Sequence, residues 1–255
     1  NYVASWENIA RTHNIKTGFD FFVNPNLTLS YTLDYNTNIS TGNNYDDNTS
    51  SVFDANKELL INYLAYNVGN NTVSTTSNGV SLRKTFDSSK IEWTMDASHT
   101  YFSDQNTNLN ENLAYNAAKV FIPSQYYYFE PVLNNKVNNI MVKTDVSLPF
   151  NPIKIDVGLK NESNFNKNIY VAYLKDYLGE KYTNANYQND FNYNENIFAS
   201  YVNAAKSIGI VSLDAGVRLE NTIISSNNPE VSRQYLNLFP NVGLAMPLDS
   251  FINFS

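Results

Sequence analysis

Residues 211–221, VSLDAGVRLEN, alternate without a break between two kinds of side chain. The odd-numbered positions carry Val211, Leu213, Ala215, Val217 and Leu219, and the even-numbered positions carry polar, charged or small residues. A period of two indicates a β-strand with two unlike faces. A water-soluble sheet hides its apolar face in a core, whereas a membrane barrel turns that face toward lipid. The function of the chain depends on which of these two environments the apolar face meets.

Strand pairs can be tested by residue number, because residues that face each other across an antiparallel hairpin have a constant sum. Four hairpins pair apolar with apolar residues in this way. The expected pairs are Phe21–Leu29 and Val23–Leu27; Leu82–Met95 and Phe86–Ile91; Val142–Leu159, Val146–Ile155 and Leu148–Ile153; and Phe198–Val217, Val202–Leu213 and Ala204–Val211. A fifth hairpin begins near residue 235 and turns near Asp249. Helical patterns are almost absent, so we predict an all-β chain of about ten strands.

The connections between these strands alternate between short and long. Short turns are expected at residues 24–26, 87–90, 149–152 and 206–209 and near residue 249. Long polar segments are expected as external loops at about 39–78, 103–137, 161–194 and 223–234. Tight turns on one side and long loops on the other are typical of outer-membrane barrels. Within the long segments, residues 58–66 and 168–174 resemble strands, which we interpret as projecting beyond the membrane; an extra hairpin is the alternative.

Composition narrows the class further. Only 16% of residues are charged and 42% are hydrophobic, so much of the polarity comes from Asn, Ser and Thr. The net charge of −7 excludes nucleic acid as a partner, because no basic stripe is present to bind phosphate. Cysteine is absent, and no apolar run is long enough for a transmembrane helix. The expected strands are long enough to cross a bilayer at a tilt, so we predict an antiparallel transmembrane β-barrel. We expect residues 1–255 to form one barrel region, a portion of a larger barrel.

The alternation assigns side chains to the two faces of this barrel. We expect the charged face to line the lumen, with candidates Glu92, Asp96, Lys143, Asp145, Lys154, Asp156, Lys160, Asp214, Arg218 and Glu220. We expect the apolar face to contact lipid, with candidates Val142, Val146, Leu148, Ile153, Ile155, Val157, Val211, Leu213, Val217 and Leu219. Lys84 is an exception on the apolar face, close enough to a turn to reach the membrane interface. Arg218 and Glu220 are neighbours on one face, so an ion pair between them is expected.

Three segments resemble a known family. NYNENIFASYVNAAKSIGIVSLDAGVRLENT, QYLNLFPNVGLAM and FDSSKIEWTMDASHTYF are similar to barrel segments of TonB-dependent receptor-like outer-membrane proteins of Bacteroidetes. The resemblance runs from about residue 14 to residue 248. It implies an outer-membrane location in a Gram-negative bacterium, a barrel of about 22 strands, a plug domain, and energised uptake of a bulky ligand through TonB.

Two alternatives to transport remain open at this point. A non-transporting barrel could serve as a structural or docking subunit of an outer-membrane complex, in contact with a surface lipoprotein or other subunits. A secreted all-β adhesin is the second alternative. For a barrel of either kind, outer-membrane lipid and lipopolysaccharide are the expected surroundings.

Catalytic and metal sites are not expected. His13 and His99 have no partner at ligand spacing, so neither a metal site nor a catalytic dyad is predicted, and no cofactor or enzymatic activity is expected. The acidic stretch at 43–50 contains oxygen ligands suited to calcium, although an ordinary loop is the preferred interpretation. The tyrosine-rich stretch at 125–131 could stack on sugars or on a partner protein, or pack within the loop layer.

Overall fold

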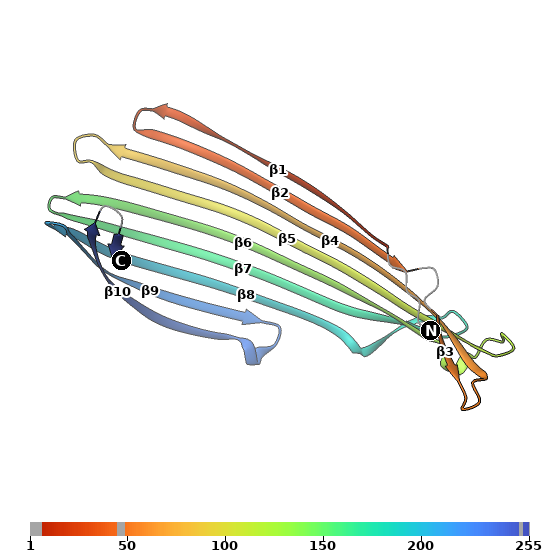
Figure 1. The fold of residues 1–255 in the computed structure, drawn as a ribbon. Coiled ribbons are helices and arrows are strands. Elements are labelled where there is room, and N and C mark those ends of the chain that lie inside the picture. The colour runs from red at the N-terminus through yellow and green to blue at the C-terminus, as the bar shows by residue number, and fades with distance from the viewer. Residues whose placement is uncertain (1–6, 45–48, 250–251, 255) are drawn as a thin grey trace.

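The computed structural model describes residues 7–44, 49–249, 252–254 of the chain. These residues form one open, curved antiparallel sheet in which the short turns lie at one end (Figure 1). The strands are β1 (Glu7–Asn24), β2 (Leu27–Asn44), β3 (Thr49–Phe53), β4 (Leu59–Phe86), β5 (Ile91–Asn116), β6 (Tyr127–Phe150), β7 (Ile153–Lys175), β8 (Lys181–Ile208), β9 (Val211–Ser226), β10 (Arg233–Asp249) and β11 (Ile252–Phe254). Two 3₁₀ turns, η1 (Pro123–Gln125) and η2 (Pro229–Val231), are the helical elements of the described part.

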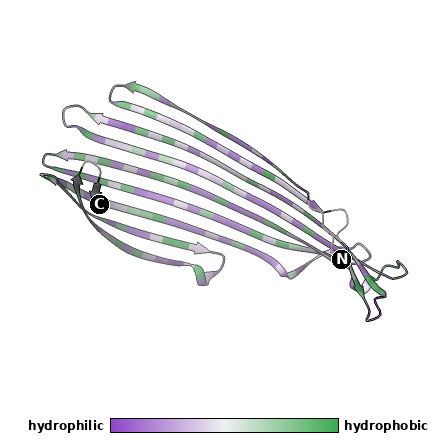
Figure 2. Ribbon diagram, viewed as in Figure 1, coloured by the Kyte–Doolittle hydropathy of each residue, from purple (hydrophilic) through white to green (hydrophobic). Residues whose placement is uncertain are grey.

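Each strand pairs with its neighbour in sequence, except that β3 lies beside β4 only. The order across the sheet is β1-β2-β4-β5-β6-β7-β8-β9-β10-β11. Hydrophobic and hydrophilic residues alternate along the strands (Figure 2). The predicted all-β antiparallel fold is therefore confirmed. Among the described residues, no helix is long and apolar enough to cross a membrane.

The strands are far longer than the predicted membrane-crossing segments. The lengths of β4 and β8 are both 28 residues, and β5 has 26, whereas about 9–11 residues cross a bilayer. The expectation of loops over most of 39–78, 103–137 and 161–194 is wrong, because the sheet continues through these polar segments. Residues 59–66 and 168–174 lie within β4 and β7, as projecting strands. The fourth segment, 223–234, contains the end of β9, then η2, then the start of β10.

The predicted registers are correct in part. Phe86–Ile91 and Leu82–Met95 pair as expected, and so does Phe21–Leu29. The pair Val23–Leu27 is wrong, because an irregularity between Phe22 and Asn24 places Asn24 opposite Leu27. The backbone N–H of Asn26 donates to Oδ1 of Asn24 at 3.0 Å and closes this turn.

Two hairpins turn more tightly than expected. The β6–β7 turn consists of residues 151–152, so Val146 faces Val157 and Leu148 faces Ile155. The β8–β9 turn consists of residues 209–210, with Gly209 at φ 61°, a conformation that suits glycine. The observed β8–β9 pairs are Phe198–Asn221, Val202–Val217 and Ala204–Ala215. Both errors shift the register by an even number of residues, which leaves every side chain on its predicted face, so the hydrophobic pattern alone could not detect them.

Candidate functional site: a two-faced sheet

The registers divide the side chains of β1 to β10 between two faces. Val146 on β6 lies opposite Trp93 on β5 and Val157 on β7, and Val157 lies opposite Val202 on β8. Following these pairs across the sheet places all the lipid-contact candidates on one face, which we call the apolar face. Its members from the prediction are Val142, Val146, Leu148, Ile153, Ile155, Val157, Val211, Leu213, Val217 and Leu219.

The opposite face, which we call the charged face, carries all the lumen candidates. Ser147 faces Glu92 on one side and Asp156 on the other, and Lys143 faces both Asp96 and Lys160. The same registers, continued through β8, add the remaining candidates of β6, β7 and β9. These are Asp145, Lys154, Asp214, Arg218 and Glu220.

Four of the ion pairs on the charged face join residues two apart on one strand. The pairs, with their N–O distances, are Lys143–Asp145 at 2.9 Å, Lys154–Asp156 at 3.1 Å, Lys160–Glu162 at 2.6 Å and the predicted Arg218–Glu220 at 2.8 Å. Arg83 bridges to Glu92 on the neighbouring strand at 2.7 Å. For Asp96 and Asp214 the described part of the chain shows no ion pair. This pattern neutralises most of the charge that the face carries.

Several members of this face were missed from the sequence, among them Glu162, Arg83 and Tyr201. Glu162 lies in a segment interpreted as a loop, and Arg83 was not considered. Tyr201 was left out because only charged residues were taken as candidates for this face. The Tyr201 hydroxyl donates to the Asp145 carboxylate, and the Lys143 ammonium lies 5.9 Å from the centre of the Tyr201 ring. Even-odd parity, applied to every strand residue rather than to charged ones alone, would have placed all three on this face.

A polar pocket opens on the charged face close to the short turns. Its volume is about 510 Å³, and its walls include Glu92, Asp145, Lys154, Asp156 and Tyr201. Carboxylates, ammonium groups and a phenol converge there from β5 to β8. Such a surface can exchange hydrogen bonds and ion pairs with a polar solute or with another protein segment.

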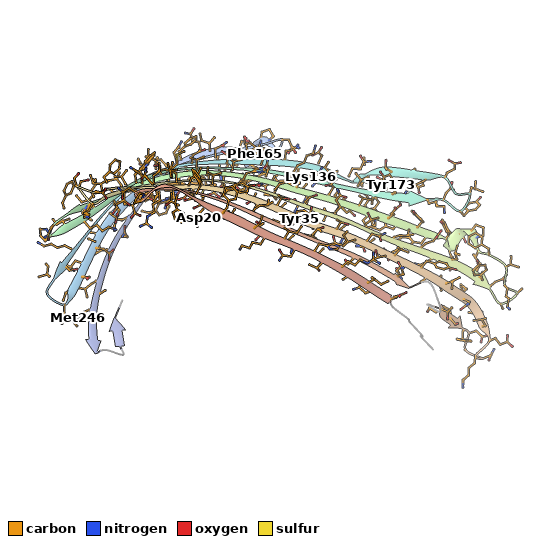
Figure 3. All side chains as sticks on the ribbon, turned by 90° about the horizontal axis from the view of Figure 1, so that it is seen from above. Asp20, Tyr35, Lys136, Phe165, Tyr173 and Met246 are labelled. Atoms are coloured by element: carbon orange, nitrogen blue, oxygen red, sulfur yellow. The ribbon has the colours of Figure 1, made fainter. Side chains whose placement is uncertain are left out.

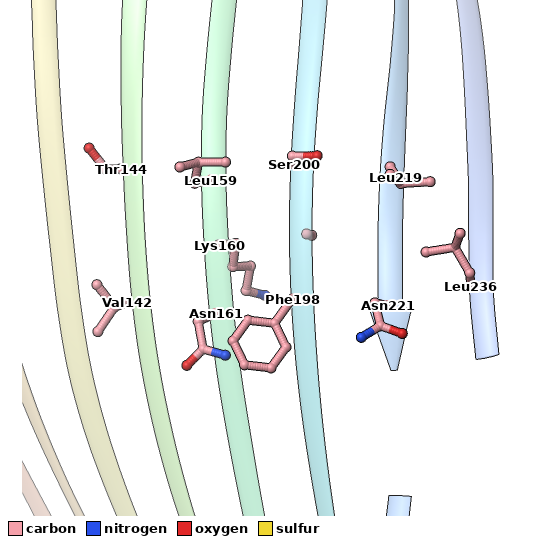
Figure 4. A pocket seen from close by; sticks show the side chains of 11 residues that line it. Val142, Thr144, Leu159, Lys160, Asn161, Phe198, Ser200, Leu219, Asn221 and Leu236 are labelled. Carbon is pink, nitrogen blue, oxygen red and sulfur yellow. The ribbon is translucent and has the colours of Figure 1, made fainter. Parts of the chain in front are cut away.

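A groove crosses the apolar face from β6 to β10 (Figure 4). Its volume is about 380 Å³, and the apolar residues that line it include Val142, Leu159, Phe198, Leu219 and Leu236. The Phe198 side chain is 52% exposed and Leu236 is 63% exposed. This face therefore presents large apolar side chains to its surroundings along with a concave site between them.

Two of the lysines on the apolar face lie beside the short turns. Lys84 was predicted there, and it lies opposite Trp93. Lys206 was assigned to a turn, but the tighter β8–β9 turn places it on this face, opposite Ile153 and Leu213. Both ammonium groups are near enough to a strand end to reach a membrane interface.

A tyrosine, carboxylate and lysine cluster lies at the far end of the sheet from the short turns. The Tyr128 hydroxyl donates to Glu130 at 2.7 Å, and the Lys181 ammonium lies 2.5 Å from the same carboxylate oxygen. Partial burial acts to raise the pKa of Glu130, but the bonds from Lys181 and Tyr128 outweigh it and lower the pKa below its ordinary value. Burial, followed by the hydrogen bond to Glu130, raises the pKa of Tyr128. The predicted tyrosine-rich segment thus packs into the sheet through charged partners.

Acid is expected to weaken this cluster. A carboxyl whose folded pKa is lowered contributes stability above its unfolded pKa, about 4.3 for Glu, and loses it as the pH falls through the folded value. We expect Glu130→Gln to destabilise the protein modestly at pH 7, because Lys181 is half-exposed. The difference between variant and wild type in urea unfolding should shrink below about pH 4. A difference that is the same at pH 3 and pH 7 would contradict this assignment.

The residues considered for metal binding do not converge. Nε2 of His99 lies 2.6 Å from Oδ1 of Asn138 in a hydrogen bond. Within the described ranges, no group of three or more His, Cys, Asp or Glu side chains is placed to hold a metal ion. Residues 45–48 of the acidic stretch considered for calcium lie outside the described residues.

The fold and its two faces define an outer-membrane β-barrel protein. Residues 84–255, more than half of the chain, match the outer membrane protein beta-barrel family, and the chain belongs to this family. The protein is therefore located in the outer membrane. No curated protein matches the sequence.

Two solved structures are similar in part. The ferric citrate transporter FecA in its unliganded form has 11% identity and a TM-score of 0.39, and the alignment covers 98% of this chain and 41% of FecA. The siderophore receptor PiuA from Acinetobacter baumannii has 9% identity and a TM-score of 0.31, with coverage of 98% and 48%. The chain thus spans less than half the length of either receptor.

Proposed function

We propose that this chain is part of an outer-membrane barrel that takes up or binds a bulky ligand, in the manner of TonB-dependent receptors. In this proposal the apolar face contacts lipid, the charged face lines the lumen, and the short turns lie in the periplasm. A plug domain and TonB would act through other parts of the protein. The resemblance in three segments to receptor-like proteins of Bacteroidetes supports the receptor assignment.

The observation that carries the proposal is the separation of charge between the two faces. Lys143, Lys154, Lys160 and Arg218 all lie on the charged face, and each has a carboxylate partner there. A Lys or Arg at the lipid face costs roughly 2–4 kcal/mol at the bilayer midplane. Turning this face toward lipid would add several such costs, whereas a water-filled or plugged lumen adds none.

The polar pocket near the short turns suits the plug. A plug that fills the lumen meets the wall through polar contacts, and Glu92, Asp145, Lys154 and Asp156 supply both signs of charge at one place. Both donors and acceptors would be satisfied by a partner of mixed charge. The same surface would contact a solute once the plug moved.

Adjacent cysteines test which face meets water. These 255 residues contain no cysteine, so they add no background to single substitutions at Val202 and Asn203. Val202 lies on the apolar face, opposite Val157 and Val217, and Asn203 lies on the charged face, opposite Asp156 and Gly216. In protein reconstituted in bilayers, we expect Asn203→Cys to react with a water-soluble maleimide at least tenfold faster than Val202→Cys.

A nitroxide label at each position provides a complementary measurement of the surroundings of the side chain. The label on Val202→Cys should respond to oxygen dissolved in the bilayer, and the label on Asn203→Cys to a water-soluble nickel complex. The reverse order at both positions would overturn the assignment of the faces. Two labels that both sense tightly packed protein would contradict the contact of the apolar face with lipid.

Transport itself is tested in cells with the full-length protein. Cells that lack it should leave at least one bulky solute unconsumed in the medium, and the full-length gene should restore consumption when TonB is present. If consumption of every detected solute is unchanged, the uptake proposal fails. The non-transporting docking barrel then becomes the preferred function, because the assignment of the faces does not depend on uptake.

A further inference from the structure

A pocket of about 350 Å³ lies at the end of the sheet that is farthest from the short turns. It is formed by the end of β5, the connection that contains η1, and the end of β7 with the turn that follows. In Figure 3, Tyr173 of β7 and Met246 of β10 lie toward opposite ends of the sheet, and Lys175 of the pocket follows two residues after Tyr173. The walls of this pocket contain none of the lipid-contact or lumen candidates.

The pocket opens on the side of the sheet that faces away from the lumen. Glu111 on β5 lies opposite Tyr128 on β6, and Tyr128 is an even number of residues from Val142 on the same strand. Lys175 is likewise an even number of residues from Val157 on β7. Since side chains alternate along a strand, both pocket residues lie on the same side as the apolar face. This placement rests on the orientation of the faces in the proposed function.

The pocket is too far along the strands for lipid to reach it. Lys175 is the last of the 23 residues of β7, so it lies about 73 Å along the strand from Ile153 at about 3.3 Å per residue. A lipid-facing band about 25 Å tall takes up about 33 Å of a strand tilted by about 40°. The occupant of the pocket must therefore come from the space outside the cell.

Three aromatic rings form one wall of the pocket. The Phe121 ring lies 6.0 Å from the Tyr115 ring and 6.2 Å from the Tyr126 ring, centre to centre. Tyr115 and Phe121 also form a backbone bridge, and the N–H of Ile122 donates to the C=O of Ala114 at 2.8 Å. The wall is thus fixed before a ligand arrives. Ring faces of this kind pack against a flat group that presents C–H bonds.

A carboxylate and an ammonium group stand beside this wall. The Tyr126 hydroxyl donates to Oε1 of Glu111 at 2.6 Å, and Nζ of Lys175 lies 3.7 Å from the same oxygen. A separation of 3.7 Å is longer than a hydrogen bond, so the ammonium group can still donate to a ligand. Both contacts use Oε1, so Oε2 of Glu111 can accept a hydrogen bond. An acceptor and a donor are therefore available side by side.

The turn after β7 forms the opposite wall. Oδ1 of Asp176 accepts hydrogen bonds from the backbone N–H groups of Leu178 and Glu180 at 2.9 and 3.0 Å. Gly179 has φ 97°, a conformation that suits glycine. The turn holds Tyr177 and Leu178 at the pocket with exposed fractions of 55% and 73%. A site with both walls already ordered loses little conformational entropy on binding.

The charges in the pocket select for a neutral ligand. Glu111 and Asp176 repel an anion, and Lys175 repels a cation. A hydroxyl group satisfies both kinds of partner, because it donates to a carboxylate and accepts from an ammonium group. A sugar ring combines hydroxyl groups at its edge with a C–H face for the aromatic wall. An apolar side chain would use the rings alone and leave the charged groups without partners.

We propose that this pocket binds a neutral sugar residue of a glycan outside the cell. The C–H face of the sugar packs on the rings of Tyr115 and Phe121, and its hydroxyl groups donate to Glu111 and accept from Lys175. The volume lies near the lower end of the range for small-molecule sites, which suits a short stretch of a glycan. A ligand taken up through the barrel passes along the other side of the wall, so this site is separate from the uptake path.

Saturation-transfer NMR with the full-length protein tests the site. Lauryldimethylamine oxide is the detergent, because it contains no sugar. The probes are neutral tetrasaccharides of glucose, xylose and mannose, the charged tetragalacturonate and tetraglucosamine, and a neutral peptide that contains tyrosine and glutamine. We expect at least one neutral tetrasaccharide to bind at millimolar concentration, and the charged oligosaccharides to bind at least tenfold more weakly. Binding of no neutral tetrasaccharide, or a preference for the charged probes or the peptide, would overturn the proposal.

Substitutions locate the bound sugar. Phe121→Leu keeps an apolar side chain but removes the flat ring, and Glu111→Gln removes the charge at nearly constant size. Each should weaken binding of the tetrasaccharide three- to tenfold. The matched controls are Phe129→Leu, opposite Asn110 on the lumen side, and Glu130→Gln, in the neighbouring cluster; neither residue lines the pocket, and both variants should bind as wild type does. If the two pocket variants also bind as wild type does, the sugar is bound elsewhere and the proposal fails.

Competition identifies the source of the glycan. Polysaccharide released from the surface of the same cells should displace the tetrasaccharide if the ligand belongs to the cell's own coat. Displacement only by glycans from the surroundings would support the same pocket with an external source. Loss of uptake in Phe121→Leu would overturn the separation of this site from the uptake path. Because binding is measured on purified protein, failure of uptake leaves the sugar site standing, and failure of the sugar site leaves the transport proposal standing.

Discussion

Val146→Arg is expected to lower the stability of the folded protein in a bilayer by about 2–4 kcal/mol, a loss of roughly thirty- to a thousandfold in the folding equilibrium. Val146 lies on the apolar face between Trp93 and Val157. It stands four residues from the end of β6, about 13 Å along the strand, and so near the middle of the lipid-facing band. An arginine there has no carboxylate beside it and must displace hydrocarbon or distort the bilayer. Urea titration in phosphatidylcholine vesicles measures the loss.

Ser147→Arg is the matched control for this experiment. The residue is adjacent in sequence, but its side chain lies on the charged face opposite Glu92 and Asp156. A guanidinium group between two carboxylates gains charge-assisted hydrogen bonds, so the stability should change by less than about 1 kcal/mol. If both arginines cost the same, or if the cost falls on Ser147→Arg, the apolar face does not contact lipid.

Gly158→Val is expected to destabilise the protein by about 1–3 kcal/mol through overpacking. A Cβ atom at Gly158 would overlap the ring and hydroxyl of Tyr201 and the carboxylate of Asp145. The Tyr201 ring lies against this glycine on the neighbouring strand and donates its hydroxyl to Asp145. Valine would displace the ring and separate the hydroxyl from its acceptor. The free energy of unfolding in detergent or vesicles measures the effect.

A double-mutant cycle identifies the cause of that loss. In a Tyr201→Ala background the ring is absent, so Gly158→Val should cost much less than it does in wild type. Valine is a favourable strand residue, so the second substitution can even stabilise the Tyr201→Ala variant. Equal costs in the two backgrounds would show that the ring does not occupy the space above Gly158.

The distribution of side chains between the faces could be read from the sequence, but the extent of the sheet could not. Alternation at residues 211–221 and the pairs Leu82–Met95 and Phe86–Ile91 were correct, because facing depends only on whether a residue number is odd or even. The predicted registers of β6–β7 and β8–β9 were wrong because Pro149 and Lys206, which had been assigned to turns, lie within β6 and β8. Adding such residues to a strand leaves its two faces unchanged, so the hydrophobic pattern does not reveal them. Turn length, rather than hydrophobicity, fixes these registers.

The polar length of the strands was missed for a different reason. Beyond the apolar band both faces of β4, β5 and β8 are rich in Asn, Thr and Ser, so the contrast that marks a strand disappears. Backbone pairing with long neighbouring strands maintains the sheet there without an alternating pattern. Lys136 and Lys167 lie in this polar region, where only the register reveals that the two residues are neighbours.

The open borders of the sheet determine which backbone amides water can reach. One side of β1 has no partner among the described strands, and β10 meets β11 only from Met246 onward. In an antiparallel strand, successive residues direct their N–H groups to opposite sides. A border that stays unpaired would therefore show deuterium uptake that alternates between fast and slow from one residue to the next along β1, and along β10 before Met246, while β5 to β7 exchange slowly throughout. A further strand that pairs with either border would protect these amides and remove the alternation. The exchange pattern therefore reports, residue by residue, whether the barrel is closed there.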